Sequence, residues 1–384
     1  MDFSHPPEHL TFYNRVRTFA TEELNGKAEA DDHAQRFPRE LWEKCAGFGI
    51  QGLSVPRAYG GATEEVDFVR ALLGMEALGY GCRDNGLAFA LNAQMWTVQV
   101  PIRDFGTEEQ KQKYLPAMAA GRLIGAHALT EPEAGSDVMS MQLAAVPQED
   151  GGYLLNGEKR YITLGPLADV VLVFAKTKPK LGAWGISAFL VDKGTAGFTQ
   201  SDKHDKMGLR SVPIGSLTFK DCYLPASALL GRDGMGYAIT NHSLEYDRCS
   251  ILASQLGAME RQLDESVQFA KSRKQFGQAI GGFQAVSHRL VDMKVRLETA
   301  RLLLHKVAWL KQQGKSAVLE AAMLKLHLSE SFVANSMDAV RTRGGDAYLG
   351  GGGVGRDLRD AVGGLLYAGT SDIQKNIIAK FLGL

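Results

Sequence analysis

The sequence predicts a multidomain α+β fold in which a β domain lies between two helical domains. Three observations support this. Residues 1–120 carry apolar side chains at helical spacing, residues 121–230 carry short β-rich runs between glycines and prolines, and residues 231–384 return to long helical patterns. A chain of 384 residues is long enough for two or three domains. We therefore place the domain boundaries near residues 120 and 230.

The first block reads as helices separated by turns. Apolar residues between Leu10 and Phe19 follow helical spacing, and further helices are expected over 40–48, 64–78 and 107–120. The turn-rich run PRAYGGAT separates two of them. This block is predicted to be the N-terminal α-helical domain.

The second block changes to short runs that suit strands, for example LIGAHAL, GYLLNGEKRYIT, ADVVLVFAKT, GISAFLVD and GSLTFKDCYL. No helical pattern lies between them. We therefore expect an antiparallel sheet, folded as a β-barrel or a sandwich.

The third block predicts a C-terminal four-helix bundle. Helical patterns run over 238–273, 283–313, 316–341 and 372–382, and glycines such as Gly314 and Gly369 mark the breaks. Helices of this length, joined by short connections, are typical of bundles.

Composition excludes several classes of function. Lys plus Arg and Asp plus Glu both number 43, so no overall charge draws the chain to nucleic acid or to an anionic membrane. No apolar run approaches the roughly 20 residues of a membrane span. The four cysteines are scattered and the nine histidines show no ligand spacing, so we expect no disulfide framework and no metal. A cytoplasmic location follows as the simplest expectation.

Four motifs carry specific information. They are Leu129–Asp137 (LTEPEAGSD), Gly157–Thr163 (GEKRYIT), Arg273–Gly277 (RKQFG) with the Phe283–Gln284 pair, and Arg359–Asp372 (RDAVGGLLYAGTSD). In order and spacing, these motifs resemble the acyl-CoA dehydrogenase family, and the match covers nearly the whole chain. The resemblance implies an FAD-dependent oxidoreductase that removes hydrogen between the alpha and beta carbons of an acyl thioester.

The resemblance assigns the first two motifs and the fourth to FAD. The first loop offers hydroxyls and backbone N–H groups, and a strand would place Tyr161 and Thr163 on one face. From the residues alone, a plain turn and an ordinary half-buried strand remain open. The FAD contacts implied are Leu129, Thr130, Gly135, Ser136, Tyr161, Ile162, Thr163, Thr370 and Asp372.

The third motif resembles residues that reach the FAD of a neighbouring subunit. Arg273 would bind the pyrophosphate, because its fork donates in two directions, with Phe276 and Gln284 beside it. A solvated helix end remains the alternative for Arg273. Arg341, Gly344 and Gly345 resemble a second such contact, although arginine stands where glutamine is usual. A site shared between chains implies a homodimer or homotetramer.

The substrate side of the resemblance lacks one residue. Most members of the family carry a catalytic glutamate in a Y-E-G-T motif, whereas this chain has Tyr367-Ala368-Gly369-Thr370. A methyl group cannot accept a proton. The resemblance to a minority branch moves the base to Asp247, with Glu245 ranked lower, although an ion pair on the helix surface would also explain Asp247. The substrate contacts implied are Ser136, Arg248, Tyr367, Ala368 and Gly369.

Three functions remain open from the sequence. The first is oxidation of an acyl thioester, on CoA or an acyl carrier protein, with Asp247 as base. The second is a flavoenzyme of the same fold that oxidises a hydroxy- or amino-substituted carrier-bound unit in secondary metabolism. The third is a flavin-binding or assembly protein without catalysis. Electron-transfer flavoprotein or O2 would be the electron acceptor in the first two.

Overall fold

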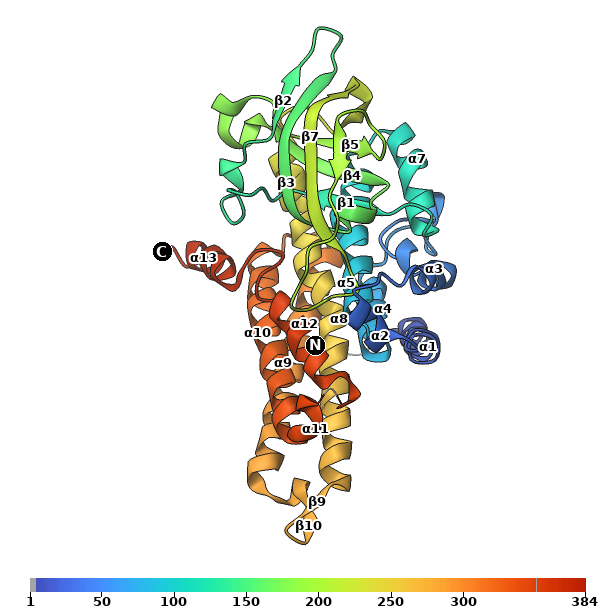
Figure 1. The fold of residues 1–384 in the computed structure, drawn as a ribbon, viewed down its shortest axis with the longest axis vertical. Coiled ribbons are helices and arrows are strands. Elements are labelled where there is room, and N and C mark those ends of the chain that lie inside the picture. The colour runs from blue at the N-terminus through green and yellow to red at the C-terminus, as the bar shows by residue number, and fades with distance from the viewer. Residues whose placement is uncertain (1–4, 350) are drawn as a thin grey trace.

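The computed structural model describes residues 5–349 and 351–384. Figure 1 shows a β-sheet domain at one end, a long helical bundle reaching to the other end, and further helices packed along one side. The N-terminal helices on that side are α1 (Pro7–Glu23), α2 (Ala28–Ala34), α3 (Arg39–Phe48), α4 (Phe68–Gly81), α5 (Asn85–Gln94), α6 (Val100–Phe105) and α7 (Glu108–Ala119).

Capping residues set where these helices begin. The helix expected over 64–78 begins only at Phe68, because the Asp67 side chain accepts a hydrogen bond from the backbone N–H of Arg70 at 2.9 Å. Thr107 and Gln110 form a reciprocal capping box at the start of α7. Helices α5 and α6, joined by a π-helical turn over Met95–Gln99, were not predicted from the sequence.

The central part is one eight-stranded sheet with the order β6-β7-β3-β2-β4-β5-β8, and β1 pairs with β4 off this path. Its strands are β1 (Gly125–Ala128), β2 (Ala144–Pro147), β3 (Tyr153–Thr163), β4 (Val170–Lys176), β5 (Ile186–Asp192), β6 (Phe198–Gln200), β7 (Ile214–Leu224) and β8 (Leu229–Leu230). Four of the five runs identified in the sequence contain one of these strands, and the fifth, GSLTFKDCYL, covers all of β7 except Ile214.

The sheet is mostly antiparallel, with one correction. β1 runs parallel to β4, and Ala144 of β2 also pairs in parallel with Lys176 of β4. β1, β2 and β4 therefore run in the same direction, and β3, which is antiparallel to β2, runs opposite to them between β2 and β4 in the chain. β6 and β8 end the order without pairing with each other among the described residues, so the sheet is open and not a closed barrel.

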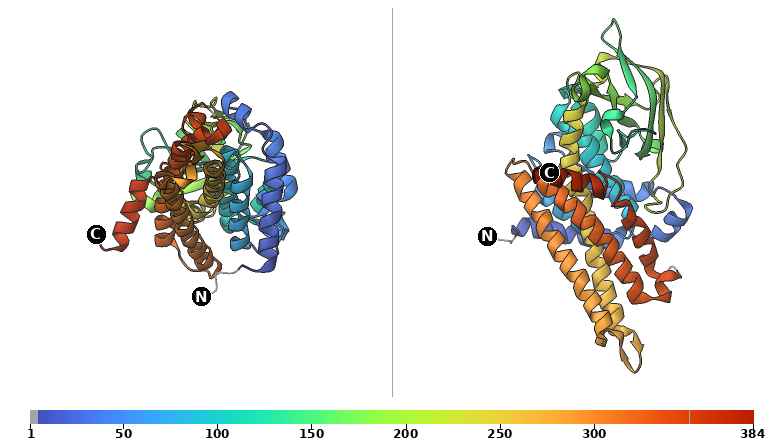
Figure 2. Two further views of the ribbon diagram at one scale, coloured as in Figure 1. Left: turned by 90° about the horizontal axis from the view of Figure 1, so that it is seen from below. Right: turned by 90° about the vertical axis from the view of Figure 1, so that its left-hand side faces the viewer.

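The C-terminal part is built on one helix of 37 residues, α8 (Gly236–Ser272). A short hairpin of β9 (Lys274–Gln275) and β10 (Gln278–Ala279) turns the chain into α9. The remaining helices are α9 (Gln284–Gln312), α10 (Val318–Arg343), α11 (Gly345–Tyr348), α12 (Val354–Gly363) and α13 (Ser371–Phe381). The second view in Figure 2 shows α8, α9 and α10 side by side, with α13 crossing near the sheet.

The hydrophobic core is continuous across these parts. Trp42 and Trp96 of the N-terminal helices, Phe189 of the sheet and Phe332 of α10 are all less than 2% exposed and belong to one cluster. Because the sheet domain and the bundle share this core, loops of the sheet are held against α8. That arrangement creates the cavity described next.

Candidate functional site

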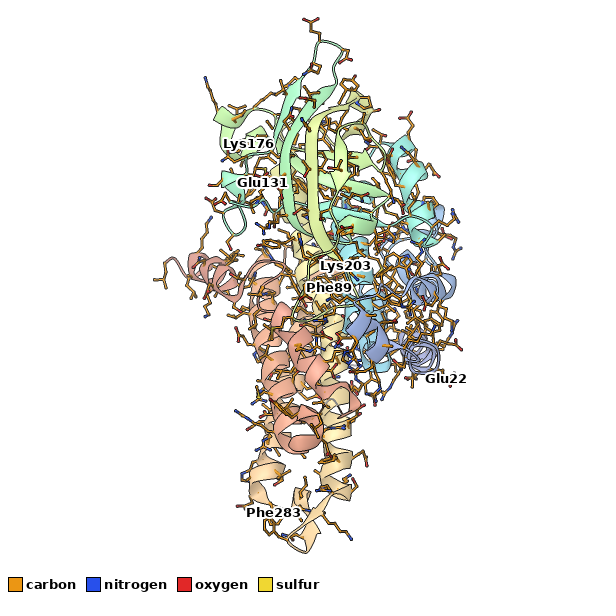
Figure 3. All side chains as sticks on the ribbon, viewed as in Figure 1. Glu22, Phe89, Glu131, Lys176, Lys203 and Phe283 are labelled. Atoms are coloured by element: carbon orange, nitrogen blue, oxygen red, sulfur yellow. The ribbon has the colours of Figure 1, made fainter. Side chains whose placement is uncertain are left out.

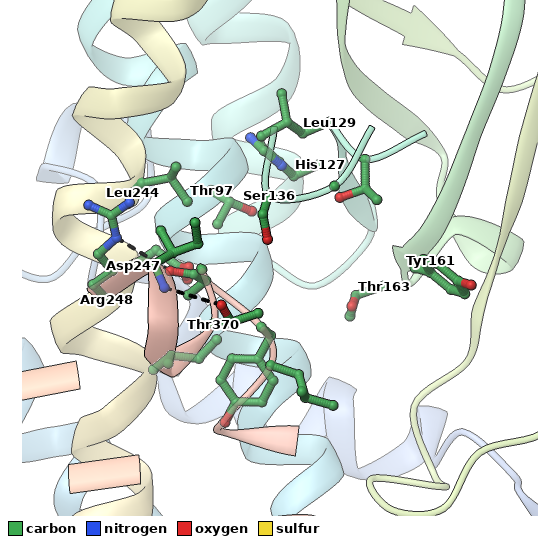
Figure 4. A pocket seen from close by; sticks show the side chains of 18 of the residues that line it. Thr97, His127, Leu129, Ser136, Tyr161, Thr163, Leu244, Asp247, Arg248 and Thr370 are labelled. Atoms are coloured by element: carbon green, nitrogen blue, oxygen red, sulfur yellow. Dashed lines mark hydrogen bonds between the residues drawn. The ribbon is translucent and has the colours of Figure 1, made fainter. Parts of the chain in front are cut away.

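A cavity of about 1400 Å³ lies where the sheet, α8 and the segment before α13 meet. Figure 4 shows Asp247 and Arg248 on α8 facing across it toward Tyr161 and Thr163 at the end of β3. Ligand cavities for drug-sized molecules measure roughly 300–1,000 Å³. This cavity is therefore large enough to hold a dinucleotide together with part of a substrate.

A buried ion pair fixes the loop that follows β1. Lys159 of β3 is fully buried, and its Nζ donates to Glu131 Oε1 at 2.8 Å and to the carbonyl oxygen of Leu129 at 2.9 Å. The Glu131 carboxylate also accepts from the backbone N–H groups of Gln142 and Leu143. Burial lowers the pKa of Lys159 to about 8, against the opposing effect of Glu131. The loop that carries Thr130 and Ser136 is thus anchored from its inner side.

The end of β3 is bent by a bulge. The register between β3 and β7 shifts between Lys159 and Ile162, and Tyr161 has a φ of 59°. A bulge increases the local twist and redirects side chains. Tyr161, Ile162 and Thr163 therefore all line the cavity, although a regular strand would turn Ile162 away from its two neighbours.

Three hydroxyl groups on the wall of the cavity can serve a flavin. Thr130, Ser136 and Thr163 line it, and none of their hydroxyls takes part in a hydrogen bond among the described residues. The loop also has room for close approach, because a β-carbon at Gly135 would meet nothing within 4 Å. A flavin ring and its pyrophosphate need donors of this kind, so the residues present fit FAD.

Asp247 lies on the opposite wall. It is 4% exposed, its Oδ1 has no hydrogen-bond partner among the described residues, and burial raises its pKa to about 7. Arg248 and Lys325 act in the opposite direction by favouring the charged carboxylate. A carboxylate whose pKa is near neutrality and whose oxygen is unoccupied suits general-base chemistry.

Glu245, the other candidate carboxylate, is already engaged. Its Oε1 accepts from the backbone N–H of Ala317 at 2.8 Å and lies 3.2 Å from Lys311 Nζ. It lines the cavity too, but its charge is used to hold α8 against the α9–α10 connection. The contrast with the unoccupied oxygen of Asp247 supports the ranking made from the sequence.

The position that lacks the glutamate also lines the cavity. Ala368 has a φ of 54°, and its carbonyl oxygen accepts from Arg248 Nε and from Gln374 Nε2, both at 3.3 Å. Gln374 also donates to the carbonyl oxygen of Gly369 at 2.9 Å. Tyr367 and Thr370 line the same wall, and Thr370 caps α13 by accepting from Ile373 N at 3.3 Å.

Seven predicted site residues lie outside the cavity of their own chain: Arg273, Phe276, Gln284, Arg341, Gly344, Gly345 and Asp372. Arg273 and Phe276 sit at the tip beyond α8, and the Phe276 ring is 93% exposed. Figure 3 shows Phe283, the residue before Gln284, at the lower end of the molecule, whereas Phe89 and Glu131, which line the cavity, lie near its middle and in its upper part. One chain therefore does not bring the third motif to its own cavity.

Three polar side chains near the cavity, Lys325, His127 and Gln374, were not among the predicted site residues. Lys325 of α10 is fully buried and its Nζ has no hydrogen-bond partner among the described residues. His127 lines the cavity, and burial lowers its pKa to about 4. Gln374 is also fully buried and holds the backbone of Ala368 and Gly369. The sequence feature that could have identified them is a polar residue at a position where helix or strand spacing predicts an apolar one.

Two further findings concern ions and membranes. No group of three or more His, Cys, Asp or Glu side chains in residues 5–349 and 351–384 is placed to hold a metal ion. Within the same ranges, no helix combines the length and apolar character that crossing a membrane requires.

Three family models match the chain in succession. They are the acyl-CoA dehydrogenase N-terminal domain over residues 6–122, the middle domain over 126–222 and the C-terminal domain over 233–383. Together they cover most of the chain and follow the order of the three structural parts.

Individual relatives are similar over their whole length. L-prolyl-[peptidyl-carrier protein] dehydrogenase of Pseudomonas fluorescens is 41% identical over all of both chains. The protein of the same name from a Serratia species is 40% identical, over 100% of this chain and 99% of the relative. An acyl-CoA dehydrogenase of Bacillus subtilis is 39% identical over 98% of each.

Solved structures agree with these relatives. The prolyl acyl carrier protein oxidase AnaB superposes with a TM-score of 0.97 at 44% identity, covering 99% of this chain and 100% of AnaB. PigA with FAD and proline superposes with a TM-score of 0.96 at 40% identity, and butyryl-CoA dehydrogenase from Megasphaera elsdenii with 0.96 at 36%. Both comparisons cover the full length of both chains.

Proposed function

This chain belongs to the acyl-CoA dehydrogenase family of FAD-dependent oxidoreductases, and from that premise we propose that it oxidises a carrier-bound amino-substituted acyl group of the prolyl class. The proposal rests on the cavity as well as on the relatives. The observation that carries it is the buried Oδ1 of Asp247, which has no hydrogen-bond partner among the described residues, in the cavity that Ala368 also lines. The runner-up function considered from the sequence, on an amino-substituted unit, is thus the one we favour.

Asp247 is proposed to act as the general base. Its carboxylate accepts the proton from the alpha carbon of the thioester, and an alpha–beta double bond forms as a hydride leaves the beta carbon. Bound FAD supplies the hydride acceptor. Burial excludes water from Asp247 and places its pKa near 7, so that the carboxylate is both populated and basic at neutral pH.

Thr130, Ser136 and Thr163 are proposed to hold the flavin by their unoccupied hydroxyls. Leu129, Gly135, Tyr161 and Ile162 would contact it from the same wall, with Thr370 across the cavity. Arg248 is proposed as a positioning residue, since it follows Asp247 on α8 and binds the backbone carbonyl of Ala368. Tyr367, Ala368 and Gly369 would line the path of the acyl group.

We propose that the FAD site is completed by a second copy of the chain. Arg273, Phe276 and Gln284 lie far from their own cavity, as expected of residues that serve a neighbouring subunit. Arg341, Gly344, Gly345 and Asp372 are also outside it and would contribute in the same way. Exposed apolar residues on α9 and at the C-terminal end of α13 are suited to a contact between subunits: Val291, Val295, Leu302, Trp309, Phe381 and the C-cap residue Leu382. A homodimer or homotetramer follows.

Electron-transfer flavoprotein or O2 is proposed as the electron acceptor, and the cytoplasm as the location. All four cysteines are buried and free, which suits a reducing compartment.

The test is anaerobic reduction of the purified holoenzyme by defined thioesters. An L-prolyl thioester on a phosphopantetheinylated peptidyl carrier protein should bleach the flavin absorbance. Butyryl-CoA, a straight-chain thioester of matched concentration, should bleach it far more slowly. Faster bleaching by butyryl-CoA would contradict the prolyl class and return the assignment to ordinary acyl-CoA oxidation.

A further inference from the structure

A basic and apolar surface lies at the N-terminal end of α8. It is formed by Lys178, Lys180, Leu181 and Trp184 of the segment between β4 and β5, together with Arg232 just before α8. We call these five residues the entrance surface. The side chains of Leu181 and Trp184 are 54% and 76% exposed, so the surface offers apolar area beside its cationic groups.

Hydrogen bonds hold the entrance surface rigidly. Asp233 accepts from Thr177 Oγ1 at 2.6 Å and from Ser187 Oγ at 2.7 Å, and it lies 2.7 Å from Lys178 Nζ. The backbones of Trp184 and Gly234 are in contact, because a β-carbon on Gly234 would lie 2.5 Å from the Trp184 carbonyl oxygen. The two segments therefore form one platform, and a partner that binds it pays little ordering entropy.

The local charge of this platform differs from that of the whole chain. Residues 176–184 and 231–237 contain four cationic side chains and a single carboxylate, Asp233, whereas the chain as a whole has no net charge. Lys180 and Arg232 form no ion pair among the described residues, and Lys178 pairs only with Asp233. The surface is thus complementary to an acidic partner.

The entrance surface lies beside one open end of the cavity. Tyr237 and Asn241 of the first turns of α8 both line the cavity and are exposed, so the cavity reaches solvent there. Tyr237 follows Gly234 by three residues. From Tyr237 to Asp247 the helix rises by roughly 15 Å, at 1.5 Å per residue. A substrate held outside the mouth reaches the base only on an extended arm.

We propose that the entrance surface is the docking site for the acidic face of the phosphopantetheinyl carrier protein that delivers the acyl thioester. The inference rests on the proposed function and names the protein surface it uses. A nucleotide such as that of CoA binds in a concave site that covers most of it. Exposed tryptophan and arginine beside apolar surface are instead typical of protein–protein contacts.

The first test is catalytic and uses the holoenzyme with two forms of one substrate, L-prolyl carrier protein and L-prolyl pantetheine. Two variants of the entrance surface are tested: the double variant Lys180→Glu/Arg232→Glu and the single variant Trp184→Ala. Each should lower kcat/KM for the carrier form by about tenfold or more, mainly by slowing association with the carrier protein. Reduction by the pantetheine thioester should stay at the wild-type rate. Lys220→Glu, which reverses an exposed charge elsewhere on the sheet, is the matched control and should change neither.

The second test measures binding without catalysis. Holo-carrier protein should bind the wild-type enzyme and the Lys220→Glu control with equal affinity. This affinity should fall at higher ionic strength. In the entrance-surface variants it should be at least about tenfold lower than in the wild type. Equal carrier binding and equal carrier kinetics in all variants would overturn the docking site while leaving the proposed function intact. Impaired binding in the variants, with a flavin that no thioester reduces, would support the docking site and overturn the proposed function.

Discussion

Arg248 donates a hydrogen bond from Nε to the carbonyl oxygen of Ala368 across 3.3 Å. The bond joins α8, at the residue after Asp247, to the backbone of the position that lacks the usual glutamate. Gln374 donates to the same carbonyl oxygen from the other side. Two helices therefore fix residue 368 on the wall of the cavity that Asp247 also lines.

A carboxylate moved to position 368 is expected to rescue an enzyme that has lost Asp247. In the double variant Asp247→Ala/Ala368→Glu, the substrate should reduce the flavin about tenfold or more faster than in Asp247→Ala, because the new carboxylate enters the same cavity. The backbone at 368 already has a φ of 54°, so glutamate adds no backbone strain beyond that of alanine. Single-turnover flavin reduction by the prolyl carrier thioester measures this. Asp247→Ala/Ala368→Gln is the matched control, and equal rates in the two double variants would contradict the prediction.

The rate of flavin reduction is expected to depend on pH through Asp247. Burial raises its pKa to about 7, and only the deprotonated form accepts a proton. The rate should therefore rise with pH to a plateau above about 7 and fall about tenfold per pH unit well below it. Stopped-flow reduction from pH 5.5 to 9 measures the profile. A rate that stays constant down to pH 5.5 would contradict this. It would show that the base has a pKa below 5.5 and is a better solvated group than Asp247.

Asp247→Asn is expected to stabilise the fold at alkaline pH. The pKa of Asp247 is raised from 3.8 to about 7 in the folded protein. The protonated carboxyl therefore favours folding at low pH, and this contribution is lost as the pH rises from about 3.8 through about 7. Three units correspond to about 4 kcal/mol, which is the most that asparagine can recover above pH 8. Urea unfolding of both proteins at pH 8.5 and pH 4.5 checks this, and the gain should shrink at the lower pH. An equal gain at both values would show that the charge of Asp247 is not its cause.

Lys325→Met is expected to shift the pH profile to higher pH. The buried ammonium of Lys325 favours the charged carboxylate of Asp247, and methionine of similar length removes that charge without leaving a polar atom behind. Flavin reduction at pH 7 should fall several-fold and recover toward the wild-type rate at pH 9. Lys325→Arg, which keeps the charge, should retain the wild-type midpoint. A uniform loss at every pH would indicate a packing role instead.

Lys159→Met is expected to weaken FAD binding. It leaves Glu131 buried without its cation, which typically costs about 3–5 kcal/mol when one partner of a buried pair is removed. The loop with Thr130 and Ser136 would lose its anchor, and FAD would dissociate more readily. Flavin fluorescence on dilution measures the loss. Lys159→Met/Glu131→Gln should bind FAD better than the single variant, and the reverse order would contradict this role for the ion pair.

Local patterns in the sequence were enough to predict the fold class. Helical spacing and β-branched runs located the long helices and the main strands, and the first two motifs placed Thr130, Ser136 and Thr163 together. Asp247 was predicted as the base because an arginine follows it and position 368 lacks the usual glutamate, and the structure places it on the cavity wall.

Features that bring together residues far apart in the chain could not be predicted from the sequence. The parallel pairing of β1 with β4 depends on two reversals of the chain, one before β3 and one after it. Lys325 could not be connected to Asp247, because they lie on different helices 78 positions apart in the chain. The entrance surface combines two segments that are joined through Asp233. Each of these features results from tertiary packing, which local sequence patterns do not predict.

The identity of the base is the central claim, and anaerobic flavin reduction by Asp247→Asn tests it most directly. With prolyl carrier thioester as substrate, the rate should fall by about 10²–10⁴-fold while FAD remains bound. Glu245→Gln, a neighbouring carboxylate engaged by Lys311, should stay within a few-fold of the wild type. Reduction of Asp247→Asn at the wild-type rate would contradict the account and remove Asp247 from the mechanism.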